Sequence, residues 1–192
     1  MGPGKIVLIR NAVETLGYFS TQIGRELKRM GAEIYWIDFE RIYESLEGLG
    51  RFVNGEGAAL LTFNFIGLSG EEIFSAEPGA GGAPRTVWER YGMRYVNILV
   101  DHPMYFHTKL LRAPAGMRLF CIDREHVRYV RRFYPGIRAE FLPVAGNELL
   151  PDMPPLPCEK RRYDLVFTAN YVCFDDRAAR LAVQGPEYES FF

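Results

Sequence analysis

The sequence predicts an α/β fold built on a doubly wound, mainly parallel sheet of about six strands. Two observations support this class. Short runs of consecutive apolar residues recur along the chain, as in strands that are covered on both faces. Between them lie segments whose apolar residues are spaced three or four apart, as in helices that pack on a sheet. Strands that alternate with helices favour parallel pairing through right-handed crossovers, which is a Rossmann-like layout.

The first part of the chain repeats a strand and helix unit. Residues 5–10 (KIVLIR) form the first predicted strand, and a helix with regularly spaced apolar residues follows it. Gly31 stands where glycine commonly ends a helix. The next predicted elements are a strand at 33–38 (EIYWID), a helix at 39–50 and a strand at 58–67 (AALLTFNFIG).

Three more strands are predicted in the second part of the chain. They lie at residues 94–101 (RYVNILVD), 118–123 (RLFCID) and 139–144 (AEFLPV), with a helix at 124–134 between the last two. Residues 76–85, rich in Gly, Pro and Ala, connect the third and fourth strands, and we expect a flexible connection because the GK[ST] of a phosphate loop is missing. The turn after the first strand also lacks the glycines of a dinucleotide site.

Three regions are predicted along the chain. Residues 1–147 form the Rossmann-like domain, and residues 148–162 form a Pro-rich linker. Residues 163–192, which begin with the strand-like run YDLVFTANY, are either the start of a truncated second domain or an extra strand and helix. We favour docking of this piece on the first domain.

Charge and cysteine content exclude several classes of protein. The net charge of −1, from 23 basic and 24 acidic residues, argues against nucleic acid as a partner. Cys121, Cys158 and Cys173 lack CxxC spacing, so they predict neither a disulfide framework nor a zinc site. We find no apolar run of membrane-spanning length and no signal-peptide pattern, and we therefore expect a cytoplasmic protein with no transmembrane segment.

Polar residues follow the predicted strands. Because ligands bind outside the carboxyl ends of the strands in such sheets, these residues are candidates for a site. Asn and Asp also favour strand-end turns and helix N-caps, so any one of them alone is more easily explained as structural. Together they predict a polar edge that contains Asn11, Asp38, Asn64, Asp101, His102 and Asp123.

The segment Asp101-His102-Pro103 is the strongest candidate for chemistry. A histidine beside a carboxylate at a strand end can act as a general base, or the carboxylate can orient the ring. A capping Asp and a structural His at an X-Pro turn explain the same residues equally well. The five-residue spacing from His102 to His107 does not fit a helical metal site, and GxSxG is missing, which excludes a serine hydrolase with a nucleophile elbow.

An arginine-rich face is predicted on the helix at 124–134. It carries Arg124, Arg128, Arg131 and Arg132. A solvated helix face is the simpler interpretation. The alternative is salt-sensitive contact with an anionic acceptor or an acidic partner, helped by Arg138 and by residues 160–162.

Five segments in order resemble a known family. They are TFNFIG (62–67), VDHPMYFH (100–107), CIDREHVRYVRRFYP (121–135), FLPVAGN (141–147) and YDLVFTANY (163–171). They resemble the N-terminal half of bacterial glycosyltransferase-like proteins of the spore-maturation-protein type, in which two Rossmann-like domains face each other in the GT-B arrangement. The resemblance covers about residues 1–171.

The resemblance implies a transferase that moves a sugar from a nucleotide-sugar donor to an acceptor hydroxyl. The N-terminal domain of such enzymes holds the sugar or glycan acceptor, and a C-terminal domain, nearly all of which is absent here, holds most of the donor. We therefore expect the isolated chain to be inactive and to need neither a cofactor nor a metal. The implied catalytic residues are His102 and Asp101, and the implied substrate-binding residues are Asn11, Asn64, Asp123 and His107.

Two other functions remain open. The same fold could serve as a non-catalytic module that binds a saccharide or a protein, because fold alone does not decide function. A nucleotide-binding enzyme of another class is less favoured, since the first strand is not followed by the glycines that a pyrophosphate would need.

Overall fold

The computed structural model describes residues 4–55, 57–76, 85–146, 154 and 156–166. The chain divides into two compact units, residues 1–145 and 146–192. The first contains the sheet described below. In the second, the described residues include a short 3₁₀ turn, Cys158–Lys160. The predicted strand at 163–171 lies mostly outside the described residues, and its first four residues are exposed and are not in a strand.

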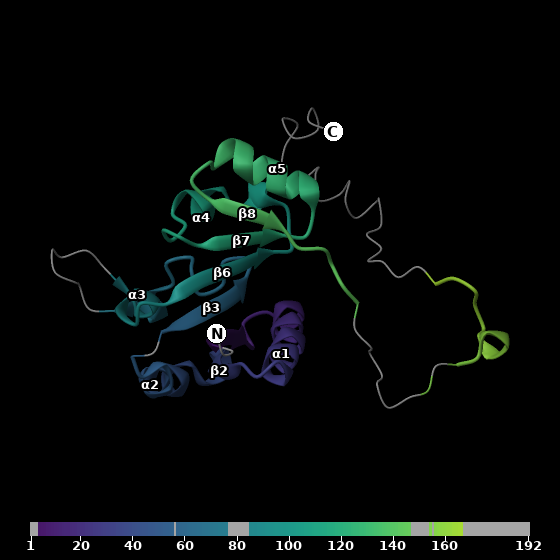
Figure 1. Cartoon of the computed structure of the whole chain (residues 1–192), viewed down its shortest axis with the longest axis horizontal. Coiled ribbons are helices and arrows are strands. Elements are labelled where there is room, and N and C mark those ends of the chain that lie inside the picture. Colours follow the sequence, from purple (N-terminus) through teal and green to yellow (C-terminus); the bar gives the residue numbers. More distant parts are fainter. Residues whose placement is uncertain (1–3, 56, 77–84, 147–153, 155, 167–192) are drawn as a thin grey trace, which may run out of the picture. The chain divides into compact units, whose positions relative to one another are not determined.

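The first unit is built on a sheet of six parallel strands in the order β2-β1-β3-β6-β7-β8 (Figure 1). This confirms the predicted doubly wound α/β fold. The strands are β1 (Lys5–Arg10), β2 (Glu33–Asp38), β3 (Ala58–Phe63), β6 (Arg94–Leu99), β7 (Arg118–Cys121) and β8 (Arg138–Phe141). A separate two-residue ladder joins β4 (Ser75–Ala76) to β5 (Arg85–Thr86).

The order in which the chain adds strands to the sheet reverses between β1 and β3. The chain passes from β1 outward to β2, then crosses back over β1 to β3 and continues outward on the other side. Right-handed crossovers in opposite directions place their helices on opposite faces of a sheet. The helices are α1 (Glu14–Arg29), α2 (Ile42–Val53), α3 (Val87–Arg90), α4 (His107–Leu111) and α5 (Arg124–Phe133).

The two faces of the sheet have cores of different size. On one face α1 packs on Phe63 and Ile98 through Leu16. Gly24 allows this helix to approach closely, since a Cβ there would lie 2.8 Å from atoms of both Leu8 and Trp36. The other helices contribute to the larger core on the second face, whose fully buried members include Trp88, Phe65, Phe74, Leu49, Leu99, Leu119 and Val130.

Several predicted boundaries differ from the structure. The third strand ends at Phe63 rather than at residue 67, because Asn64 and Phe65 have left-handed backbone angles, with φ of 50° and 62°. The one-turn helix α3 was not predicted, although Thr86 and Glu89 form a complete capping box at its start. No helix among the described residues is long and apolar enough to cross a membrane.

Candidate functional site

The site begins with the left-handed turn that follows β3. Residues other than glycine adopt left-handed backbone angles at an energetic cost. A turn that contains two such residues must therefore be held by its surroundings. Asn97, fully buried in the neighbouring strand β6, accepts the N–H of Phe65 on its Oδ1 at 3.0 Å. The N–H of Asn64 donates to the carbonyl of Ile98, also at 3.0 Å. These two bonds fix the turn to β6 and set the direction of the Asn64 side chain.

Asn64 in turn orients Asp101 at the end of β6. Its Nδ2 donates to Oδ2 of Asp101 at 2.8 Å, and its Oδ1 accepts the N–H of Val100 at 3.1 Å. The structure gives Oδ1 of Asp101 no partner among the described residues, and Asp101 is exposed. A carboxylate held by one oxygen therefore presents the other to solvent. Nδ2 of Asn64 carries a second hydrogen, which a sugar oxygen could accept. The hydrogen bond from Asn64 to a sugar stays a prediction.

His102 has a defined hydrogen-bonding state. It caps the 3₁₀ turn Pro103–Phe106, and its Nδ1 accepts the N–H of Met104 at 3.2 Å. A neutral ring that accepts on Nδ1 carries its hydrogen on Nε2. Pro103 fits the first position of this turn because it needs no N–H partner. His102 can thus donate a hydrogen bond from Nε2 to a ligand oxygen.

His126, which no sequence pattern singled out, lies against His102. The two ring centroids are 4.6 Å apart in an edge-on arrangement, and Nδ1 of His126 is buried without a partner among the described residues. Burial and then the charge of His102 lower the pKa of His126, while Asp123 and Asp101 act in the opposite direction. The ring is therefore mainly neutral at pH 7. The sequence does indicate His126 in one respect: it lies in the first turn of the helix that follows β7, near the edge of the sheet where a site is expected.

Asp123 and His107 have other partners. Asp123 caps α5 by accepting the N–H of Glu125 on Oδ1 at 2.6 Å, so its carboxylate has a structural task as well as its effect on His126. Nδ1 of His107 lies 2.7 Å from the hydroxyl of Tyr134, directly after the last residue of α5. His107 thus contacts the opposite end of that helix, and the structure does not bring it to the cluster formed by the other residues.

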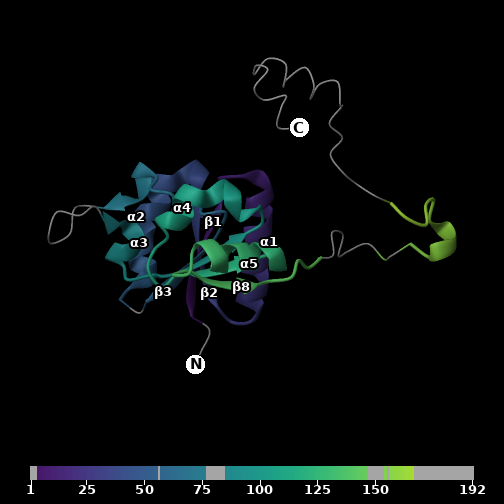
Figure 2. The same ribbon diagram turned by 90° about the horizontal axis from the view of Figure 1, so that it is seen from above.

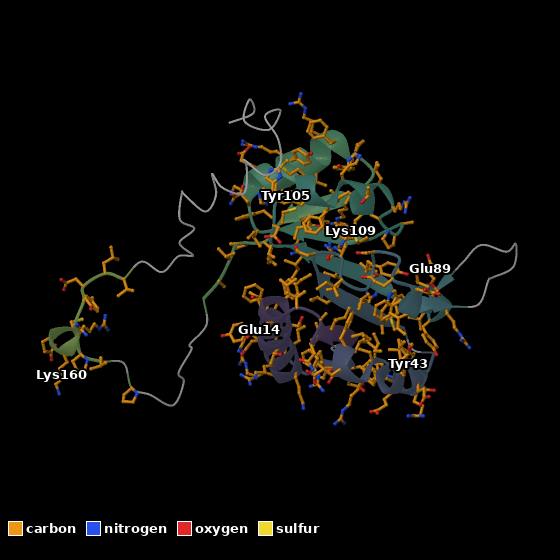
Figure 3. All side chains as sticks on the ribbon, turned by 180° about the vertical axis from the view of Figure 1, so that it is seen from behind. Glu14, Tyr43, Glu89, Tyr105, Lys109 and Lys160 are labelled. Carbon is orange, nitrogen blue, oxygen red and sulfur yellow. The ribbon has the colours of Figure 1, made fainter. Side chains whose placement is uncertain are left out.

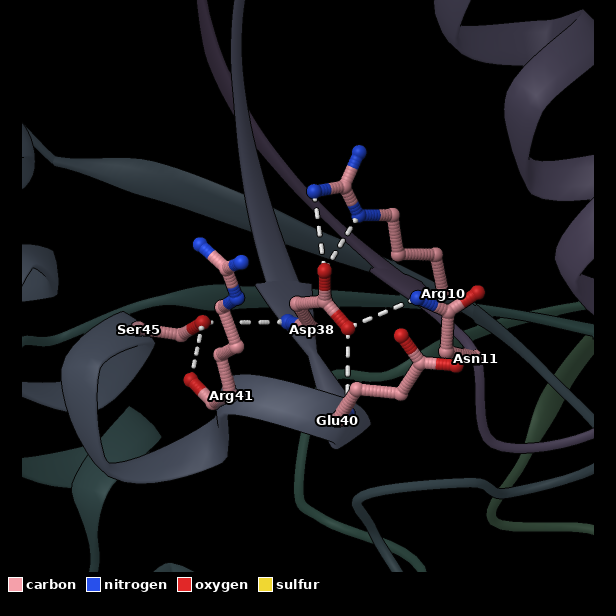
Figure 4. A network of polar contacts seen from close by, with 6 residues as sticks. All are labelled: Arg10, Asn11, Asp38, Glu40, Arg41 and Ser45. Carbon is pink, nitrogen blue, oxygen red and sulfur yellow. Dashed lines mark hydrogen bonds and ion pairs between the residues drawn. The ribbon is translucent and has the colours of Figure 1, made fainter.

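Asn11 belongs to a second polar group, at the ends of β1 and β2 (Figure 4). Its Nδ2 donates to Oδ1 of Asp38 at 2.8 Å, and the N–H of Glu40 donates to the same oxygen at 3.0 Å. Nε and Nη2 of Arg10 lie 3.0 and 2.8 Å from the other carboxylate oxygen. Burial raises the pKa of Asp38, but these hydrogen bonds and the charge of Arg10 outweigh it and lower the pKa.

The Asp38 group forms one wall of an open cleft of about 640 Å³. The exposed side chains of Glu14, Glu40 and Arg41 add charged groups to the cleft, and Tyr18 adds a ring. Glu14 lies at the start of α1 (Figure 3), where a carboxylate favours the helix dipole but opposes a phosphate. The cleft therefore suits a ligand rich in hydroxyl groups better than a nucleotide. It is lined by Arg10, Asn11, Glu14, Gly17, Tyr18, Thr21, Asp38, Glu40 and Arg41.

The described residues contain no group of three His, Cys, Asp or Glu side chains placed to hold a metal ion. Cys121 is buried in β7, and burial followed by the charge of Asp123 raises the pKa of its thiol to about 11. Its thiol is therefore protonated at neutral pH and is a poor ligand or nucleophile.

The chain matches no known family model, no curated protein and no solved structure. The resemblance to glycosyltransferase-like proteins accordingly stays a prediction from the sequence segments that carry it.

Proposed function

We propose that this domain binds the acceptor in a glycosyltransferase that moves a sugar from a nucleotide-sugar donor to an acceptor hydroxyl. The observation that supports this best is the hydrogen-bonded pair of Asn64 and Asp101 beside His102. These residues follow two neighbouring strands of a doubly wound sheet, at the edge where such folds bind ligands. The reaction class itself comes from the resemblance of the sequence segments.

Asp101 is assigned the role of general base. Its Oδ2 is held by Asn64, so Oδ1 can accept the proton of the acceptor hydroxyl. The hydroxyl oxygen bonds to the anomeric carbon while the bond from that carbon to the nucleotide diphosphate breaks. His102 would donate from Nε2 to an acceptor oxygen and so orient it, and it is not the proton acceptor while Met104 occupies its Nδ1.

The polar cleft beside Asp38 and the exposed ring of Tyr105 are the proposed contacts for the rest of the acceptor. Tyr105 is 74% exposed and comes three residues after His102 (Figure 3). A tyrosine offers an apolar face together with a polar tip, which suits the mixed surface of a sugar ring. In this proposal the donor nucleotide is bound by a companion domain, because Glu14 opposes a phosphate at the start of α1.

Calorimetric titration of the 192-residue chain with monosaccharides and oligosaccharides tests the binding part of the proposal. We expect saturable binding that Asp101→Asn and His102→Ala each weaken about tenfold, the effect of losing one good hydrogen bond. His107→Ala is the matched control, since His107 lies outside the cluster, and it should change the affinity less than about twofold. Absence of saccharide binding, or equal losses in all three variants, would reject the assignment.

Turnover tests the catalytic part. In a polypeptide that joins this domain to a donor-binding domain, Asp101→Asn should lower kcat by about 10²-fold or more, as expected for loss of a general base. Unchanged turnover removes Asp101 from the mechanism.

A non-catalytic binding module is the second candidate, and one observation favours it. Met104 and Tyr105, two apolar side chains beside His102, are 57% and 74% exposed, which is typical of a contact surface. Binding of saccharide with no turnover in the joined polypeptide would select this function.

A further inference from the structure

We propose that the cleft between α5 and β8 is a binding site for a phosphate group. His126 and Tyr129, which contact His102, are not among the residues that line this cleft, so the proposal does not depend on the function proposed above. The segment that forms it, residues 118–142, carries six arginines and three carboxylates in a chain whose net charge is −1. Positive charge is thus concentrated in one strand-helix-strand unit.

Three arginines line this cleft. Arg124, Arg128 and Arg131 are spaced four and three apart, so they form one stripe along α5. The helix lies beside β8 in both views (Figures 1 and 2), and Phe141 of that strand forms the opposite wall. The space is about 230 Å³, Val127 also lines it, and none of the described residues that line it carries a carboxylate.

Two of the guanidinium groups are held in place before any ligand binds. Arg131 donates from Nε and Nη2 to the carbonyl of Ala139 at 3.1 and 2.9 Å, and its other guanidinium N–H groups have no partner among the described residues. Arg124 packs over Phe141 with 4.2 Å between its guanidinium carbon and the ring centroid, and it has no ion pair among the described residues. Fixed donors lose less entropy when an anion binds.

The nearby carboxylates Asp123 and Glu125 are not among the residues that line the cleft. Asp123 keeps its charge while its Oδ1 accepts the N–H of Glu125, and Glu125 pairs with Arg128 through an exposed contact one turn apart. Exposed pairs of this kind are weak and are easily replaced. A phosphate group, with more charge and three acceptor oxygens, can take Arg128 from Glu125 and bridge to Arg124. The cleft is too small for a macromolecular surface, and it fits a phosphate with part of the group that carries it.

The test titrates the 192-residue chain with inorganic phosphate and with diphosphate at low and high salt. We expect saturable binding that weakens as salt rises. Arg124→Gln and Arg128→Gln should each weaken binding about tenfold or more, because each removes a charge-assisted bond. Arg132→Gln is the matched control: it removes the same charge from the same helix but lies outside the cleft, and it should weaken binding less than about twofold.

A second pair of variants tests the competing carboxylate. Glu125→Gln frees Arg128 and should tighten binding of diphosphate, whereas Glu26→Gln breaks the equivalent pair with Arg29 in α1 and should leave it unchanged. Equal tightening in both variants would indicate a general effect of net charge and would overturn the proposal.

Two further outcomes are decisive. Lack of saturable phosphate binding at low salt, or equal losses in Arg124→Gln and Arg132→Gln, rejects the site. A phosphorylated monosaccharide that binds more tightly than inorganic phosphate, with this gain lost in Phe141→Ala, identifies the source as a phosphorylated small molecule. Equal affinity identifies free phosphate. In both cases Asp101→Asn should not change the affinity for phosphate, which separates this site from the saccharide site.

Discussion

Replacement of Asp38 by alanine should destabilise the end of the sheet that borders the polar cleft. The side chain of Asp38 is only 11% exposed, and each of its oxygens accepts two donors. The substitution removes all four interactions together. It also removes the side chain that caps the 3₁₀ turn Phe39–Arg41, through which the chain enters α2.

The magnitude follows from the separate contacts. Loss of the cap to the N–H of Glu40 costs about 1 kcal/mol, and loss of the bond from Asn11 costs about as much. Arg10 is 45% exposed, so water replaces much of its ion pair, which contributes about 0.5 kcal/mol. The free energy of unfolding should therefore fall by about 2–3 kcal/mol in Asp38→Ala and by about 0.5 kcal/mol in Arg10→Ala.

Urea unfolding followed by tryptophan fluorescence measures both variants, since Trp88 is fully buried and Trp36 lies beside Arg10. A loss below about 0.5 kcal/mol in Asp38→Ala, or equal losses in Asp38→Ala and Arg10→Ala, would show that the carboxylate does not organise this edge.

Acid titration supplies an independent check on Asp38. Its folded pKa is lowered, so its stabilisation is fully present above the unfolded pKa of about 3.9 and is lost as the pH falls through the folded pKa. Asp38→Asn should reduce the dependence of stability on pH in that range. An unchanged dependence would contradict the lowered pKa.

Three further predictions use other parts of the domain. Gly24→Ala should lower the free energy of unfolding in urea by about 1–2 kcal/mol, because its methyl group would meet two side chains. Gly17→Ala should not, because the nearest atom to its new Cβ, the backbone N of Asn11, would lie 3.5 Å away, and equal effects would contradict the packing. Iodoacetamide at pH 8 should label Cys158, which is exposed, and not Cys121, whose pKa is about 11; rapid labelling of both in the folded chain would contradict this. His126 should titrate by NMR below about 6.5, and its neutral ring should stabilise the fold above that pH and lose this effect as the pH falls through the folded pKa; a midpoint above 6.5 would contradict its burial.

The strands were predictable because most of them lie in largely apolar runs, and the first two match their predicted bounds. The strand order was not predictable in the same way. It depends on which side of β1 each crossover returns to, and the apolar runs are too similar to encode this choice. The helix α3 was missed because one turn shows no periodicity, although Thr86 and Glu89 carry a capping signal.

The candidate site was predictable where it follows from strand ends and not where it depends on tertiary contact. Asn64, Asp101 and His102 were selected because parallel strands end at the same edge. The pairing of His126 with His102 requires α5 to pack beside the turn after β6, which no local pattern specifies. Asn97 was overlooked inside the apolar run RYVNILVD, although a polar side chain in a buried strand must find a partner.

Asn97 links the core to the site. It is fully buried and holds the N–H of Phe65, one of two consecutive residues with left-handed backbone angles. That turn places Asn64 against Asp101, so the direction of the exposed carboxylate after β6 depends on a buried amide within the same strand. An apolar residue at position 97 would leave the N–H of Phe65 buried and without a hydrogen bond, and the strained turn would no longer be held. The polar residue in the core is thus explained by the geometry of the site rather than by the packing of the sheet.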